Sequence, residues 1–115
     1  HYICYVKFER MLVKFNQEYL EEIYTTGKCS DKKHRFQPGV IKNYIRRVDT
    51  LRDAENVEQL FPINSLNYET LEGNKQGISS VRINDQYRLE FTVTKEGNEP
   101  VITICTLLDI TNHYK

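Results

Sequence analysis

The sequence predicts an α+β domain in which an antiparallel-dominated sheet of four to five strands carries two or three helices on one face. Two observations lead to this prediction. Apolar residues recur at helical spacing in the first half of the chain, whereas strand-like alternation prevails after Asn64. The chain also has 115 residues, the length of one ordinary domain with a single core.

The first half predicts one strand followed by two helices. Residues 12–15 are typical of a strand, and Asn16 is a good N-cap for a helix that ends near Gly27. A second helix is expected to begin at Pro38. Its apolar stripe has the spacing of a buried helix face and consists of Val40, Ile41, Tyr44, Ile45, Val48 and Leu51. A short helical segment around Val57, Leu60 and Phe61 should stop at Pro62.

The second half predicts an antiparallel meander. Residues 78–83 and 87–93 are expected to form a hairpin, because a three-residue loop over 84–86 pairs Ile83 with Tyr87 and keeps the apolar face continuous. The run 101–108 is apolar at almost every position, which is typical of a central strand covered on both faces.

We interpret residues 1–10 as an N-terminal extension or an extra strand, and residues 11–115 as a single domain. Apolar residues at 39% exclude a disordered chain. We expect neither a membrane span nor a signal peptide, because charges interrupt every apolar stretch. The three cysteines Cys4, Cys29 and Cys105 form neither a disulfide framework nor a zinc motif. Reduced thiols in a cytoplasmic protein without metal or cofactor are therefore expected.

The formal net charge is zero, but the charges are polarised along the sequence. Residues 28–47 carry a net charge of +6, whereas residues 48–72 carry −5. The basic run is either a solvated helix face or a surface that attracts an anionic partner. In the second interpretation, Arg46 and Arg47 are candidate contacts to phosphate groups. The neutral total predicts weak binding to a free nucleic acid.

The hairpin places two arginines opposite each other. The predicted register pairs Arg82 with Arg88 on the face opposite the apolar one. Two facing cations need an anion nearby. Glu90 would supply it in an exposed ion-pair ladder, whereas a phosphate group would supply it in a binding site, since a guanidinium matches phosphate oxygens in a bidentate manner.

Two further segments carry candidate site residues. The turn over residues 71–77 brings Lys75 toward the hairpin, and its glycines permit a close bend. The chain ends with His113 and Tyr114 soon after the expected central strand. These two residues are either incidental to function or suited to proton transfer and base stacking.

Residues 71–91, and above all the run from Gly77 to Phe91, resemble the core signature of the RelE/ParE toxin superfamily. Within it the chain is most similar to the HigB branch, also called plasmid maintenance system killer proteins, over residues 11–115. The resemblance implies a RelE-like fold and a toxin of a type II toxin-antitoxin pair. It also implies a HigA-like helix-turn-helix antitoxin as partner, and ribosome-dependent cleavage of mRNA as the activity.

The resemblance also implies roles for the candidate residues. Arg88 would stabilise the charge of the transition state, while Lys75 and Arg82 would hold phosphates. His113 and Tyr114 would serve proton transfer or base stacking. Glu69 and Glu72 stand where the family often has His and Lys, so Glu69 becomes a candidate base. The family commonly has Asp-Tyr-His near the end, whereas this chain has Asn112, His113 and Tyr114.

Two other functions remain open at this point. ParE-like relatives inhibit DNA gyrase without cleaving RNA, so the chain could be a gyrase inhibitor. It could also be a degenerate toxin that acts only by binding its antitoxin.

Overall fold

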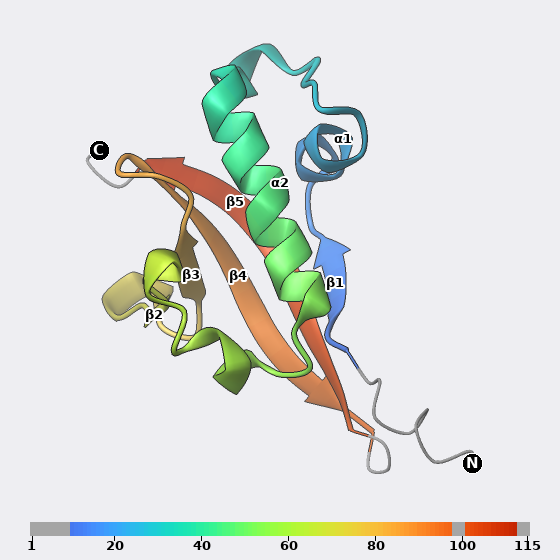
Figure 1. Cartoon of the computed structure of the whole chain (residues 1–115), viewed down its shortest axis with the longest axis vertical. Helices are drawn as coiled ribbons and strands as arrows, with labels where there is room; N and C mark the ends of the chain where they lie inside the picture. Colours follow the sequence, from blue (N-terminus) through green and yellow to red (C-terminus); the bar gives the residue numbers. More distant parts are fainter. Residues whose placement is uncertain (1–9, 98–100, 113–115) are drawn as a thin grey trace.

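The computed structural model describes residues 10–97 and 101–112. Five strands and two α-helices make up most of the described chain, together with short 3₁₀ helices (Figure 1). In chain order the elements are β1 (Leu12–Phe15), α1 (Glu18–Thr26), η2 (Lys32–His34), α2 (Pro38–Asp53), η3 (Val57–Leu60), η4 (Asn64–Leu66), β2 (Glu69–Thr70), η5 (Gly73–Lys75), β3 (Ser79–Arg82), β4 (Tyr87–Glu96) and β5 (Ile102–Asn112).

The five strands form one sheet in the order β1-β5-β4-β3-β2. Only β1 and β5 run parallel, and the other neighbouring strands pair antiparallel. The first strand therefore lies beside the last one, at the edge of the sheet. This arrangement confirms the predicted α+β class and the antiparallel-dominated sheet.

The two α-helices begin and end close to their predicted limits. Gly27 ends α1 in the left-handed conformation, with φ of 76°, and its N–H donates to Ile23 O at 2.8 Å. Pro38 lies in the first turn of α2, as predicted. The N-cap prediction is wrong by one residue, because Gln17 caps α1 and does so without a side-chain hydrogen bond. Its Nε2 instead donates to Leu108 O, which ties the helix start to β5.

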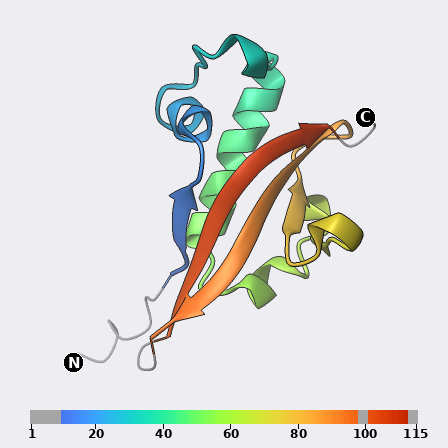
Figure 2. The same cartoon turned by 180° about the vertical axis from the view of Figure 1, so that it is seen from behind.

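The core lies between one face of the sheet and the helices. In Figure 1 α2 crosses in front of β4 and β5, and in Figure 2 the opposite face of the sheet is turned to the viewer with α2 behind it. Four residues of the predicted α2 stripe are buried: Val40, Tyr44, Val48 and Leu51. They belong to the same core as Val81, Ile83, Leu89 and Phe91 from the hairpin strands.

The last strand is central but not covered on both faces. β5 lies between β1 and β4, as predicted for the run 101–108. However, Ile102 is 46% exposed, because the helices cover only one face and do not reach this end of the strand. The prediction of two-sided burial is therefore wrong at the start of β5, whereas Cys105 and Leu107 are fully buried.

The proposal of an extra strand before residue 10 falls outside the described residues. Of that segment the structure describes only Arg10, whose Nη1 lies 4.0 Å from Asp53 Oδ1. Met11 is buried, and its N–H donates to Ala54 O just after α2.

Candidate functional site

A cavity of about 290 Å³ opens on the sheet face opposite the α-helices. The turn that contains η5 forms one wall of it. This turn is drawn faint behind the sheet in Figure 1 and comes forward in Figure 2. The lining residues come from β2, β3, β4, β5 and this turn: Glu69, Leu71, Glu72, Lys75, Ser80, Arg88, Glu90, Thr111 and Asn112. Three residues predicted from the sequence, Glu69, Lys75 and Arg88, thus meet in one place.

The hairpin has the predicted register. Arg82 pairs with Arg88 across β3 and β4, and Ile83 N donates to Tyr87 O at 3.0 Å. Because side chains alternate along a strand, burial of Val81 and Leu89 in the core turns both arginines to the open face. Apolar alternation therefore predicts the face on which both arginines lie, although Arg88 lines the cavity and Arg82 does not.

Arg88 is held by backbone carbonyl groups. Its Nη1 donates to Asn84 O at 2.7 Å and to Tyr87 O at 3.2 Å. Asn84 Oδ1 in turn accepts from the N–H groups of Gln86 and Tyr87, which fixes the loop. Within the described part of the chain no carboxylate forms an ion pair with Arg88. The side chain is thus held at the cavity by backbone oxygens and forms no ion pair with the glutamates that line the same cavity.

Of the two alternatives for this pair of arginines, the ion-pair ladder with Glu90 does not form. Arg82 instead pairs with Asp85 in the hairpin loop. Glu90 Oε2 accepts from Lys75 Nζ at 2.8 Å and from Thr111 Oγ1 at 3.1 Å. The turn folds over the sheet and brings Lys75 to Glu90, a tertiary contact that sequence spacing does not reveal.

Glu69 and Glu72 are both exposed at the rim of the cavity. Glu69 lies in β2, opposite Ser80, and its Oε2 accepts from Asn67 Nδ2 at 3.2 Å. A carboxylate in this position is accessible to a substrate that enters the cavity, as a general base must be.

Arg46 and Arg47 lie on α2, outside the cavity lining. Arg46 is exposed, as predicted for a residue off the apolar stripe. Arg47 is half-buried, and its Nε donates to Arg82 O at 2.6 Å, so it ties α2 to the start of the hairpin loop. Burial, and then the charges of Arg82 and Arg46, lower the pKa of Arg47.

His113 and Tyr114 lie outside the described residues. The sequence places them directly after Asn112, which lines the cavity. Sequence reasoning missed Ser80 and Thr111 as cavity residues and assigned Glu90 to another role. Ser80 and Glu90 could have been found from the hairpin register, because they lie two positions from Arg82 and Arg88 on the same face.

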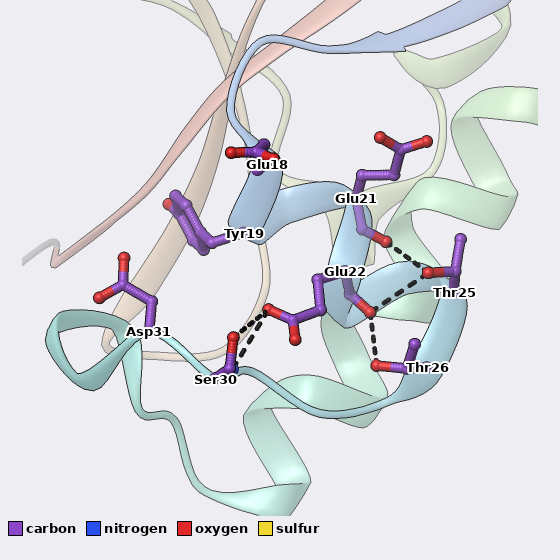
Figure 3. A pocket seen from close by; sticks show the side chains of 8 residues that line it. All are labelled: Glu18, Tyr19, Glu21, Glu22, Thr25, Thr26, Ser30 and Asp31. Carbon is purple, nitrogen blue, oxygen red and sulfur yellow. Dashed lines mark hydrogen bonds between the residues drawn. The ribbon is translucent and has the colours of Figure 1, made fainter.

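A larger hollow beside α1, of about 580 Å³, is lined by carboxylates and by no lysine or arginine (Figure 3). Four carboxylates line it, together with hydroxyl groups: Glu18, Glu21, Glu22, Asp31, Tyr19, Thr25, Thr26 and Ser30. Oγ1 of Thr25 and Thr26 donates to α1 carbonyls, and Ser30 Oγ donates to Glu22 Oε1. This hollow offers no cation to an RNA phosphate, whereas the cavity at Arg88 carries Arg88 and Lys75 beside its three glutamates.

Metal-binding clusters and membrane-spanning helices are absent from the described ranges 10–97 and 101–112. These ranges contain no group of three or more His, Cys, Asp and Glu side chains that could hold a metal ion. Nor do they contain a helix with the length and apolar character needed to cross a bilayer.

Comparison with known proteins gives the family. A model described as the RelE-like toxin of the type II toxin-antitoxin system HigB matches residues 13–105. Toxin HigB-1 of Vibrio cholerae serotype O1 is 39% identical over 82 residues, which span 70% of this chain and 82% of that protein. The solved YoeB/ParE toxin from Agrobacterium tumefaciens shares the fold with a TM-score of 0.54 at 16% identity. This match covers 90% of this chain and 100% of that one. The chain therefore belongs to the HigB-like family of RelE-like toxins and is the toxin of a type II toxin-antitoxin system.

Proposed function

We propose that this toxin is a ribosome-dependent endoribonuclease that cleaves mRNA and so inhibits translation. The observation that carries the proposal is the cavity in which Arg88, Lys75 and Glu69 meet, with no acidic partner for Arg88 among the described residues. A guanidinium held in place without a carboxylate is well suited to bind a phosphate.

The proposed reaction is attack of a ribose 2′-oxygen on the adjacent phosphorus. A base removes the 2′-hydroxyl proton, the O2′–P bond forms and the P–O5′ bond breaks. The products are a 2′,3′-cyclic phosphate and a 5′-hydroxyl, whose oxygen takes up a proton from an acid. Arg88 stabilises the extra negative charge on the phosphorane oxygens. Lys75 and Arg82 contact the same or the neighbouring phosphate.

Glu69 is our candidate for the base, because it is the exposed carboxylate at the cavity that takes the place of the family's usual His. His113 and Tyr114 are candidates for proton transfer and for stacking on a base. They follow Asn112 directly in the sequence, and Asn112 lines the cavity.

The charge distribution supports dependence on the ribosome. None of the seven lysines and arginines in residues 28–47 forms an ion pair within the described chain, so this region can approach structured RNA. The exposed carboxylates Glu69 and Glu72 at the rim of the cavity repel a free RNA strand. We therefore propose that the ribosome presents the mRNA, that the toxin acts in the cytoplasm and that a HigA-like helix-turn-helix antitoxin neutralises it.

Primer extension on an mRNA with purified ribosomes tests the proposal. We expect cuts within the translated frame that require ribosomes, and no cuts in the same mRNA alone. Gyrase–DNA adducts without RNA cuts would instead establish a ParE-like inhibitor. Neither cuts nor adducts, with antitoxin binding retained, would identify a degenerate toxin.

A further inference from the structure

We propose that Glu90 is a positioning residue, which holds the Lys75 ammonium group at the cavity so that Lys75 and Arg88 together clamp one phosphate. This inference rests on the proposed nuclease function and assigns a role to a residue outside the site predicted from the sequence. Glu90 and Arg88 lie two positions apart on β4 and therefore on the same face of the sheet. Both line the cavity.

Glu90 is buried, and its carboxylate therefore requires a specific partner for its charge. Its side chain is only 10% exposed, whereas the other two cavity carboxylates, Glu69 and Glu72, are exposed. A buried carboxylate is unfavourable unless it is paired and hydrogen-bonded. Lys75 Nζ forms the ion pair with Glu90 Oε2 at 2.8 Å, and Thr111 Oγ1 donates a further hydrogen bond to the same oxygen at 3.1 Å.

Lys75 depends on this contact for a defined position. It is the last residue of η5, in a turn, and its side chain is 51% exposed. A lysine stem is flexible, so an exposed lysine without an anchor would sample many rotamers. The ion pair with Glu90 restricts the ammonium group to the cavity wall that also carries Arg88.

The pairing leaves Lys75 able to bind a phosphate. An ammonium group has three N–H donors, and the bond to Glu90 uses one of them. The other two can reach phosphate oxygens while the first stays on Glu90. Glu90 thus acts through Lys75, in contrast to Glu69, which is exposed at the rim and accessible to the substrate.

A double-mutant cycle tests this role with Glu90→Gln, Lys75→Ala and the double variant. The probe is a ribosome whose A-site codon carries 2′-O-methyl riboses, which prevents cleavage, and toxin affinity is measured by filter binding. The single-turnover rate on the unmodified mRNA is measured in parallel. Glu96→Gln, an exposed glutamate on the same strand, is the matched control.

We expect E90Q to slow cleavage about tenfold to 10²-fold, a loss typical of a misplaced binding group. The same substitution should have no further effect in the Lys75→Ala protein, since the two residues act as one unit. An equal loss in both backgrounds would overturn the proposal, because Glu90 would then act independently of Lys75. Tighter RNA binding by E90Q would also overturn it, because Glu90 would then compete with the phosphate.

A second measurement is independent of cleavage. NMR order parameters of the Lys75 Cε methylene, assigned by its loss in Lys75→Ala, should fall in E90Q and stay unchanged in Glu96→Gln. Unchanged order in E90Q would overturn the proposal even if cleavage slows. If the wild-type toxin does not cleave mRNA, the proposed function fails, whereas this measurement still decides whether Glu90 holds Lys75.

Loss of the buried charge could also destabilise the protein. If E90Q does not fold, Glu90→Asp replaces it, because this variant keeps the charge but shortens the side chain by one methylene. We expect an intermediate loss of Lys75 order and of cleavage rate. Full retention of both by Glu90→Asp would contradict a role that depends on the position of the carboxylate.

Discussion

Arg82 and Arg88 occupy directly paired positions on β3 and β4, yet their side chains have different partners. Arg82 forms an ion pair with Asp85 in the hairpin loop, whereas Arg88 donates to the carbonyl oxygens of Asn84 and Tyr87. The loop therefore neutralises one arginine and only orients the other. This asymmetry makes Arg88 the arginine available for the reacting phosphate, and leaves Arg82 as a candidate for a neighbouring phosphate.

The first prediction concerns replacement of this arginine. We expect Arg88→Ala to reduce the cleavage rate by about 10²–10³, as for other preorganised donors that stabilise a transition state. Arg88→Lys should recover only part of the loss, because lysine keeps the charge but lacks the bidentate fork. The measurement is single-turnover cleavage of ribosome-bound mRNA.

The matched control for this prediction is Lys95→Ala. Lys95 is an exposed cation on the same strand, beyond the cavity, and its removal should leave the rate unchanged. Equal rates for the wild type and Arg88→Ala would exclude Arg88 from the reaction. A similar loss in both variants would point to a general electrostatic effect.

The register of the β3–β4 hairpin could be predicted from the sequence, because the register decides which side chains are buried. A shift by one residue would turn Leu89 to solvent and Arg88 into the core, so only one register is compatible with the pattern. The pairing of Ile83 with Tyr87 and of Arg82 with Arg88 followed from this constraint alone. The end of α1 at Gly27 and the start of α2 at Pro38 could also be predicted, since each of these residues has a specific backbone role.

The charge partners within the site could not be predicted in this way. The pair of Lys75 with Glu90 spans 15 residues and exists only because the η5 turn folds back over the sheet. The sequence also offered no reason to prefer Asp85 over Glu90 as the partner of Arg82, because both are within reach on a hairpin. The roles of His113 and Tyr114 stay predictions, since both lie outside the described residues.

The second prediction concerns the reactivity of Cys105. This thiol is fully buried in β5, and burial raises its pKa to about 12. Because the thiolate is the reactive form, we expect Cys105 to resist iodoacetamide in the folded protein between pH 7 and 9. The partly buried Cys29 should be labelled first, as measured by mass spectrometry in a Cys4→Ser background. Labelling of Cys105 at the rate of Cys29 would contradict the packing of β5.

The third prediction is a loss of stability at alkaline pH. Tyr44 is buried, its hydroxyl donates to Leu20 O at 2.7 Å, and burial raises its pKa above the usual value. The unfolded chain releases this proton near pH 10, whereas the folded protein retains it. The contribution of Tyr44 is therefore fully present below about pH 10 and declines at higher pH, by at most about 1.4 kcal/mol per pH unit.

Urea unfolding between pH 8 and 11 measures this effect. Tyr44→Phe should lose about 0.5–1.5 kcal/mol at pH 8, because one hydrogen bond is removed. Above pH 10 its free energy of unfolding should fall less steeply than that of the wild type. Tyr19, whose pKa is also raised, mainly by burial, should account for part of the remaining slope. An unchanged slope in Tyr44→Phe would show that Tyr44 does not titrate on unfolding.

The last prediction concerns Arg46 and Arg47 of α2, for which the sequence predicts the same role as phosphate contacts. Arg47 Nε donates to Arg82 O at 2.6 Å, whereas Arg46 is exposed and has no such contact among the described residues. We expect Arg47→Ala to lower the free energy of unfolding by about 1.5–3 kcal/mol, the range for a hydrogen bond to a charged group. Arg46→Ala should change it by less than about 0.5 kcal/mol.

The affinity for ribosomes should depend on Arg46, in contrast to the free energy of unfolding, which should depend on Arg47. If Arg46 contacts an RNA phosphate, Arg46→Ala should weaken binding and reduce the slope of log Kd against log salt concentration by about one. Urea titrations and binding at several salt concentrations measure the two effects separately. A destabilised Arg46→Ala together with a fully stable Arg47→Ala would contradict the placement of α2 against the hairpin. An unchanged salt slope in Arg46→Ala would show that its charge is only solvated, because an exposed arginine that contacts no phosphate releases no counterion on binding.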